Sequence, residues 1–449
     1  MQKTRDFSGV TNRLSHFIAD CSYDDIPLEV RQKAKGALLD WLGAAIGGTR
    51  QPGVNLLLSV ILEMGGNKEA TILGTGNKTN VLFAALVNGM ASHSLDFDDT
   101  HMPTLCHCSS ALLPALIAMA ECHGKSGKEL LSAYVVGFET QVRIGLAAGR
   151  SHYERGWHAT STLGRFGAAI GVAKLLSLDI DGISRAMGLA ATQAAGLRET
   201  FGTMCKPFHP GKAAMDGVMS ALLSSRGFSA PVAILEGKAG FLNVLSDSPK
   251  PEAAMNELGK RYFFLENSYK PYASCRLTHP VIDSVKQLRV DIAPQDVVSI
   301  DLFLGPLCLD AAGIKTPRTG LEAKFSVFHC AALALVQGDA SAAHFNDDQV
   351  MDPLLVDLRE KVRVTPVEGM KDGEARVVVT TKDGRTLEAH VSAPKGDPVN
   401  PMSFDDLVEK FKLLSGTVLS GEKVNRIVEM VEGMDDVEDV GQLVRYCHV

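Results

Sequence analysis

The segment 92–107 concentrates side chains that can donate and accept protons. It lies between two apolar runs and holds His93, Asp96, Asp98, Asp99, Thr100 and His107. Carboxylates this close oppose one another's ionisation, and burial raises the pKa of any that is enclosed, which suits a group that moves protons near neutral pH. The segment therefore indicates an acid–base site. The alternative is a solvated helix end, where aspartates often cap helices or form turns.

Three further clusters of polar side chains fall at the boundaries of predicted helices, over 156–162, 203–212 and 270–280. They contribute cations and imidazoles: His158, Lys206, His209, Lys270, Arg276 and His279. Helix starts also present unpaired backbone N–H groups and the positive end of the helix dipole, so these clusters suit anions. We expect Pro207 to keep Lys206 outside helical geometry. Taken singly, each cluster is weak evidence for a binding site, because lone lysines are commonly surface residues and a histidine at a helix start is often a cap.

The bulk composition is that of an ordinary globular protein, with 449 residues of which 45% are hydrophobic and 22% are charged. The net charge of -7 and the dispersal of the 45 lysines and arginines argue against a nucleic-acid partner. No apolar run follows the first residues, so we predict neither a secretory signal nor a membrane anchor. The expected location is the cytoplasm.

The nine cysteines are irregularly spaced, and in a long chain without a secretory signal they indicate reduced thiols. Cys106 and Cys108 flank His107, with His101 nearby, which raises the possibility of a zinc site. Neighbouring residues point in different directions, however, and no C-x2-C pair completes a tetrahedral ligand set. We therefore predict no metal.

Apolar residues recurring at intervals of three and four predict helices over most of the first 265 residues. Their ranges are 26–48, 80–93, 109–123, 128–148, 160–176, 180–197 and 211–226. Glycines and alanines within them, such as Gly164 and Gly167, indicate close helix packing, and no strand-linked G-x-G-x-x-G unit indicates a dinucleotide cofactor.

The pattern changes after residue 270. Alternation of apolar and polar residues predicts strands over 297–304, 362–367, 375–381 and 386–391. The segment 382–385 is typical of a hairpin turn, and the segment 325–337 is typical of a helix. Ser403 and Asp406 form a predicted capping box at the start of a last helical stretch, 404–444.

We therefore predict a mainly α fold. A large all-helical domain spans 1–269, a smaller α+β lid domain spans 270–395, and C-terminal helices over 396–449 return to complete the helical domain.

Six motifs together resemble the MmgE/PrpD family, which includes 2-methylcitrate dehydratases, cis-aconitate decarboxylases and iminodisuccinate epimerases. They are H-S-L-D-F-D-D-T at 93–100, H-C-S-S-A-L-L-P at 107–114, G-W-H-A-T-S-T at 156–162, F-G-T-M-C-K-P-F-H-P-G-K-A-A at 201–214, K-P-Y-A-S-C-R-L-T-H-P at 270–280 and A-K-F-S at 323–326. The resemblance covers nearly the whole chain. It implies a helical domain with a smaller lid, a homodimer and no cofactor.

The chemistry that this family performs agrees with the residues present. Removing a proton next to a carboxylate, or losing water or CO2 from a polycarboxylate, needs a base, an acid and cations that hold the carboxylates and the developing charge. By resemblance, the expected catalytic residues are Asp96, His107, His158 and Lys206, and the expected substrate-binding residues are Thr100, His209, Lys270, Cys275, Arg276 and His279. We assign Asp96 or His107 as the base, His158 as the acid or charge stabiliser, and Lys206 as the carboxylate partner. Asp98 and Asp99 would cap or orient their neighbours.

Two positions depart from the family's pattern. Where the decarboxylases carry a histidine five residues after the junction lysine, this chain has Cys275. This difference disfavours decarboxylation. His329 occupies a position often held by tyrosine, and we interpret it as a packed core histidine.

The sequence thus favours a cofactor-independent dehydratase or hydratase acting on a small di- or tricarboxylic acid, with 2-methylcitrate dehydratase as the nearest type. An epimerase of an iminodisuccinate-type dicarboxylate and a cis-aconitate-type decarboxylase are the alternatives, because one fold can host several chemistries. A non-catalytic helical dimer that binds a carboxylate is the alternative of another class. The acid, base and imidazole clusters at separate helix ends argue against it.

Overall fold

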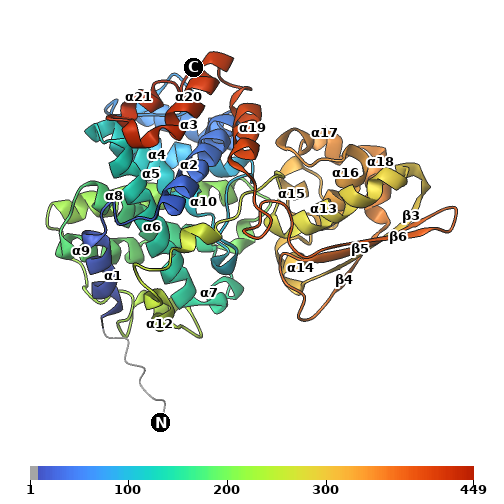
Figure 1. Ribbon diagram of the computed structural model, residues 1–449, viewed down its shortest axis with the longest axis horizontal. Coiled ribbons are helices and arrows are strands. Elements are labelled where there is room, and N and C mark those ends of the chain that lie inside the picture. The colour runs from blue at the N-terminus through green and yellow to red at the C-terminus, as the bar shows by residue number, and fades with distance from the viewer. Residues whose placement is uncertain (1–8) are drawn as a thin grey trace, which may run out of the picture.

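A computed structural model describes residues 9–449 of the chain. Figure 1 shows a large group of helices on one side and a smaller mixed α/β layer on the other, joined where the segment before α13 and the segment before α19 run side by side. The fold is mainly α with a smaller α+β part, as the sequence predicts.

The helical part is built on helices that match the predicted apolar periodicities closely. Its longer helices are α1 (Val10–Asp20), α2 (Leu28–Gly48), α3 (Pro52–Met64), α4 (Val81–Ser94), α5 (Cys108–His123), α6 (Gly127–Ala148), α8 (Ala159–Leu175), α9 (Ile180–Thr192) and α10 (Cys205–Ser225). Short elements are α7 (Arg150–Glu154), α11 (Phe241–Leu245), α12 (Pro251–Met255) and the hairpin of β1 (Ala70–Thr71) and β2 (Lys78–Thr79).

Glycines let the central helices approach closely, as the sequence predicts. A Cβ atom on Gly89 of α4 would lie 2.5 Å from the Cα atom of Gly211 on α10, and one on Gly164 of α8 would lie 2.5 Å from the side chain of Ala111 on α5. Real Cβ atoms do not reach such distances, so larger residues would push these helices apart. The close packing brings the ends of α4, α5, α8 and α10 together, where the polar clusters lie.

Several predicted boundaries are wrong. Helix α10 begins at Cys205 rather than 211, so Lys206 is helical despite Pro207, because in the first turn of a helix a missing N–H removes no intrahelical bond. Helix α9 ends at Thr192 rather than 197. The sequence analysis also missed α1 and α3. Helix α3 carries exposed apolar residues, including Leu56 and Met64, which blur its periodicity.

The smaller part is a four-stranded sheet with helices against it. Its strands are β3 (Val297–Leu304), β4 (Val362–Pro366), β5 (Ala375–Thr381) and β6 (Thr386–Val391), in the order β4-β3-β5-β6 with only β3 and β4 parallel. The helices are α13 (His279–Leu288), α14 (Pro306–Ala312), α15 (Gly320–Ala323), α16 (Val327–Gln337), α17 (Asp347–Val350) and α18 (Pro353–Glu360). In Figure 1, α13, α16 and α18 cover one face of this sheet. The predicted hairpin is confirmed, with Gly384 at φ 83° in its turn.

The C-terminal stretch is three helices rather than one: α19 (Phe404–Ser415), α20 (Gly421–Glu432) and α21 (Val440–Val444). The Ser403–Asp406 capping box is confirmed. Helix α19 packs against α2, where Lys410 Nζ lies 2.6 Å from Asp40 Oδ1 inside the protein. This return of the tail is visible in Figure 1. The domain limits at 269 and 395 stay a prediction.

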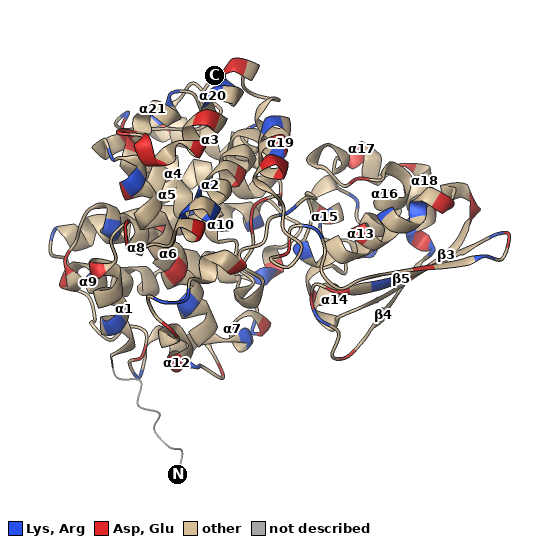
Figure 2. Ribbon diagram, viewed as in Figure 1, with Lys and Arg blue, Asp and Glu red and all other residues tan. Residues whose placement is uncertain are grey.

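Charged residues of both signs are interspersed over both parts in Figure 2, as expected for a chain of small net charge. Within residues 9–449, none of the helices combines the length and the apolar character that crossing a bilayer would require.

Candidate active site

The loop between α4 and α5 carries the densest polar segment of the chain. Asp96 has φ 50°, a left-handed conformation that is uncommon for residues other than glycine. Asp99 accepts hydrogen bonds from the Ser109 backbone N–H (3.2 Å) and from Asn267 Nδ2 (2.6 Å), so it caps the start of α5. Burial, together with the nearby Asp40, raises the pKa of Asp99 to about 7. The predicted capping role of Asp99 agrees with these contacts.

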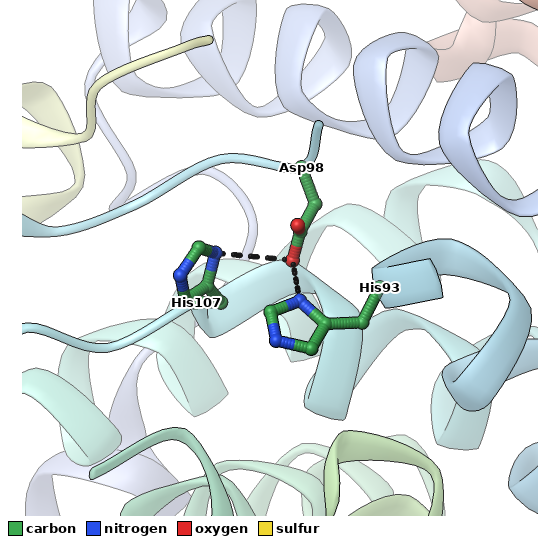
Figure 3. A group of neighbouring side chains, drawn as sticks. All are labelled: His93, Asp98 and His107. Atoms are coloured by element: carbon green, nitrogen blue, oxygen red, sulfur yellow. Dashed lines mark hydrogen bonds and ion pairs between the residues drawn. The ribbon is translucent and has the colours of Figure 1, made fainter. Parts of the chain in front are cut away.

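Asp98 lies between two histidines, as Figure 3 shows. Its Oδ2 atom is 2.8 Å from Nδ1 of His93 and 3.2 Å from Nδ1 of His107, and it accepts a hydrogen bond from Ser110 Oγ at 2.6 Å. Burial opposes ionisation of Asp98, but the two imidazoles outweigh it and hold its pKa well below the usual value. Asp98 therefore orients both rings, as predicted for a residue that acts through its neighbours.

The hydrogen bonds of His93 assign its tautomer. Lys206 Nζ lies 2.9 Å from His93 Nε2, and an ammonium can only donate, so Nε2 carries the lone pair. The ring proton is then on Nδ1, which donates to Asp98. Burial lowers the pKa of His93 to about 4, and the charge of Lys206 acts in the same direction. His93 is therefore neutral, and both of its nitrogens are used within the protein.

His107 is the N-cap residue of α5, and its backbone N–H donates to Thr160 Oγ1 of α8 at 3.0 Å. Its Nδ1 faces Asp98 and also lies 3.3 Å from Thr100 Oγ1. Within the described part of the chain, the polar contacts of this ring all involve Nδ1, so Nε2 is left unused, and the ring lines a cavity. Burial and the nearby Lys270 lower the pKa of His107. The result is a neutral imidazole with a lone pair open to the cavity, which is the form of a general base.

Two lysines enclose Asp96. Lys206 Nζ lies 2.5 Å from Oδ1 and Lys270 Nζ lies 3.2 Å from Oδ2, with all three side chains buried. Burial disfavours the charged carboxylate, yet the two ammonium groups hold the pKa of Asp96 well below its usual value. A carboxylate stabilised in this way is a poor proton acceptor. Of the two bases that the sequence proposes, the geometry favours His107.

His158 is the N-cap residue of α8, as its predicted place at a helix start requires. Its Nδ1 lies 2.8 Å from Nδ1 of His209, so one ring donates and the other accepts. The centroid of the His158 ring is 6.1 Å from that of His93, which in turn is 4.6 Å from His107. Burial and the neighbouring His209 lower the pKa of His158 well below its usual value.

A cavity at the junction of the two parts collects most of the sequence-predicted residues. Eight of them line it: Asp96, Thr100, His107, His158, Lys206, Lys270, Cys275 and Arg276. His209 does not line it and reaches it only through His158, and His279 is turned away, with Nε2 3.2 Å from the carbonyl oxygen of Ser274. These two residues lie behind the wall of the cavity, and neighbours in the chain line it instead: Lys206 near His209, and Arg276 and Leu277 near His279.

The sequence analysis did not select several residues of this wall. They are Met102, Leu105, Tyr153, Phe201, Leu277 and Phe325. Phe201 and Phe325 contact the Lys206 ammonium from 5.5 and 4.9 Å to the ring centroids. Their sequence neighbourhoods look like those of ordinary core aromatics. The available signal is that Phe201, Leu277 and Phe325 each lie inside one of the family motifs. His93, which also lies in a motif, was noted but not assigned.

Comparison with known proteins identifies the relationship. The MmgE/PrpD N-terminal domain matches residues 12–254, and the MmgE/PrpD C-terminal domain matches residues 272–436. The chain belongs to the MmgE/PrpD family. It is 28% identical to a cis-aconitate decarboxylase of Aspergillus terreus over 470 residues, which cover 97% of this chain and 95% of that protein. It is 28% identical to the cis-aconitate decarboxylase of Homo sapiens over 430 residues, covering 92% and 89% of the two chains.

Cys275 is the position at which the sequence analysis expects the decarboxylases to carry a histidine. The thiol lines the cavity, and burial, with the nearby charge of Asp96, raises its pKa. It is therefore protonated at neutral pH, so it cannot accept a proton as a neutral histidine can. His329 is fully buried on α16, and neither ring nitrogen has a hydrogen-bond partner among residues 9–449. This agrees with a packed core histidine.

One group of three side chains in the described residues could hold a metal: His93, Asp98 and His107, whose ligand atoms lie within 4.8 Å of one another. It is not the Cys106–Cys108 cluster considered from the sequence. Hydrogen bonds to Asp98 already use Nδ1 of both rings, and the Lys206 ammonium beside His93 would repel a cation.

We accordingly expect turnover to survive exhaustive dialysis against EDTA, because the Nδ1 atoms of His93 and His107 are already engaged with Asp98. The measurement is kcat before and after dialysis, with a metal-free buffer blank as control. Loss of activity that only zinc or iron restores would contradict this expectation and assign a metal to the site.

Proposed function

We propose that this protein is a cofactor-independent lyase of the dehydratase or hydratase type, which removes a proton next to a carboxylate of a small di- or tricarboxylic acid. The observation that carries the proposal is the His107 imidazole, which is held by Asp98 through Nδ1 and lines the cavity with Nε2 unused by the described residues. Proton abstraction next to a carboxylate needs such a base beside cations. Lys206 and Lys270 supply cations on the same wall.

The substrate class follows from the charge of the wall. Three cations line the cavity, Lys206, Lys270 and Arg276, against one anion, Asp96. Arg276 is 5% exposed, and none of its three guanidinium nitrogens has a hydrogen-bond partner within residues 9–449, although Asp397 lies 3.6 Å away. A buried guanidinium left without partners is costly, and a substrate carboxylate would satisfy it. This supports an anionic substrate with two or more carboxylates.

His158 is suited to assist the leaving group. It contacts His209 on its far side, so a proton that it gives up can be replaced from a second imidazole. Both rings are neutral in the free protein, since burial lowers the pKa of each. A polycarboxylate in the cavity would add negative charge beside them and raise their pKa values, which favours the protonated form.

Two other reactions use the same proton abstraction. Decarboxylation of a cis-aconitate-type acid is supported by the names of the relatives. The protonated thiol at Cys275 argues against it, because decarboxylases are expected to carry an imidazole there. Epimerisation of an iminodisuccinate-type dicarboxylate would return the proton to the opposite face. We rank both reactions below elimination or addition of water as the proposed activity.

The test is incubation of the purified protein with 2-methylcitrate, cis-aconitate and iminodisuccinate in D2O, followed by proton NMR. The proposal expects deuterium next to a carboxylate together with loss or gain of water. Deuterium incorporation without loss of any group would indicate an epimerase, and release of CO2 would indicate a decarboxylase. No exchange with any polycarboxylate, while one of them still binds, would favour a non-catalytic binding protein.

A further inference from the structure

Three buried lysines hold three consecutive backbone carbonyl groups of the loop that carries Asp96. Lys324 Nζ donates to the carbonyl oxygen of Leu95 at 2.5 Å, Lys270 Nζ to that of Asp96 at 3.0 Å, and Lys410 Nζ to that of Phe97 at 2.6 Å. Each lysine is at most 6% exposed. We call these three residues the lysine cradle.

The segment held by the lysine cradle directly follows the end of α4 at Ser94. The last carbonyl groups of a helix lack intrahelical donors, and cations near this end also interact favourably with the helix dipole. The left-handed backbone of Asp96 turns the chain away from the helix axis and exposes these carbonyl groups to outside donors. The conformation of Asp96 is therefore fixed largely by side chains from elsewhere.

The cradle lysines come from distant parts of the chain. Lys410 is on α19, which packs against α2 in the helical part. Lys270 lies at the junction, between the two family domains. Lys324 ends α15 in the smaller part, and its own backbone carbonyl accepts from the Cys275 N–H at 2.9 Å. Lys324 is therefore the cradle residue that belongs to the smaller part.

Lys324 does not line the cavity that holds the candidate catalytic residues. Its ammonium is used by the carbonyl groups of Leu95 and Ala273, at 2.5 and 3.0 Å. A substrate in the cavity would not contact it. Its effect on catalysis therefore acts through the backbone that it holds and through its charge, which lies close enough to interact with Asp96.

We propose that Lys324 is a positioning residue that couples docking of the smaller part to the geometry of Asp96. When the smaller part is docked, the Leu95 carbonyl is held and Asp96 is fixed between Lys206 and Lys270. When it is displaced, that carbonyl loses its donor and the left-handed turn loses one of its three supports. The importance of Asp96 for turnover rests on the proposed function, but the coupling itself does not.

The test compares Lys324→Met, which keeps the length of the side chain and removes its donors, with the unchanged protein. Hydrogen exchange of the peptide 94–101 should become roughly tenfold faster in Lys324→Met, the size expected for losing one buried hydrogen bond. Lys361→Met is the matched control, because Lys361 is also in the smaller part but pairs with Asp357 near the surface. It should leave exchange at 94–101 unchanged.

Catalysis gives the second readout. With a polycarboxylate that the protein turns over, Lys324→Met should lower kcat about 10-fold or more and change KM less than threefold, because it disturbs positioning rather than a contact with substrate. Lys324→Arg, which keeps donors at this place, should recover part of the loss. If Lys324→Met does not fold, Lys324→Gln, which is shorter and uncharged but still polar, replaces it as the loss variant.

The outcomes separate the two proposals. Unchanged exchange at 94–101 in a folded Lys324→Met protein would overturn the coupling. If kcat is also unchanged and only the melting temperature falls, Lys324 has a purely structural role. Faster exchange confined to 94–101, in a protein that turns over no polycarboxylate, would support the coupling while the proposed function fails.

Discussion

His107→Ala should lower kcat/KM by about 10³, the usual contribution of a general base, while leaving the melting temperature nearly unchanged. The large kinetic effect is expected because the His107 ring lines the cavity, is oriented by Asp98 through Nδ1, and leaves Nε2 unused by the described residues. The small structural effect is expected because Asp98 keeps its hydrogen bonds with His93 and Ser110. Steady-state kinetics and thermal unfolding of the same preparation measure both.

His329→Phe is the matched control for this substitution. It also removes a buried imidazole, but one on α16 whose nitrogens have no hydrogen-bond partner in the described residues. Its kcat/KM should stay within about twofold of the unchanged protein, since no group of the cavity touches it. If His107→Ala keeps full activity and instead loses much stability, His107 is a structural residue and the base lies elsewhere.

The pH dependence of the unchanged protein should carry the signature of the same base. The pKa of His107 is lowered from its usual value by burial and by Lys270, so the neutral, active form predominates at pH 7. Activity should therefore be level around neutral pH and fall as the pH drops through that lowered pKa. The profile of kcat/KM, which reports the free enzyme, is the measurement. A limb that rises only above pH 8 would contradict a neutral imidazole base.

Much of the fold could be predicted because apolar residues recur at helical intervals, even in helices such as α2 whose C-terminal half is buried on all sides. The periodicity of Leu38, Trp41 and Leu42 is a local property, and it located α2 almost to the residue. The start of α10 could not be predicted this way, because whether Pro207 breaks a helix depends on its place within the first turn. The broken tail, 404–444, shows the same limit, since each of its pieces is amphipathic.

The site was predictable in its members more than in its roles. Asp96, His107, His158 and Lys206 share a cavity, and their types alone indicated acid–base chemistry. The roles depend on contacts between distant residues. The sequence could not choose between Asp96 and His107 as base, because the choice follows from two ammonium groups that reach Asp96 across more than a hundred residues of chain. The lysine cradle likewise has no local pattern.

Lys206→Ala should lower kcat/KM for polycarboxylates by on the order of 10² or more, as expected for losing a charge-assisted contact worth a few kcal/mol. Lys206 Nζ faces the cavity and also contacts Asp96 and His93, so its loss removes a cation from the substrate's side and a partner from each of these residues. Lys206→Arg should rescue little, because a planar guanidinium cannot take the place of a compact ammonium between these atoms.

Lys212→Ala is the matched control for Lys206→Ala. Lys212 is on the same helix, but it pairs with Asp216 and does not line the cavity, so its kcat/KM should stay within about twofold of the unchanged protein. Breaking a buried ion pair also destabilises a protein, so activity is compared per folded molecule. Neutral esters of the same acids provide the decisive comparison. If Lys206→Ala leaves kcat/KM unaltered for every polycarboxylate, and the esters react as well as the acids, then cations do not select the substrate and the proposed substrate class fails.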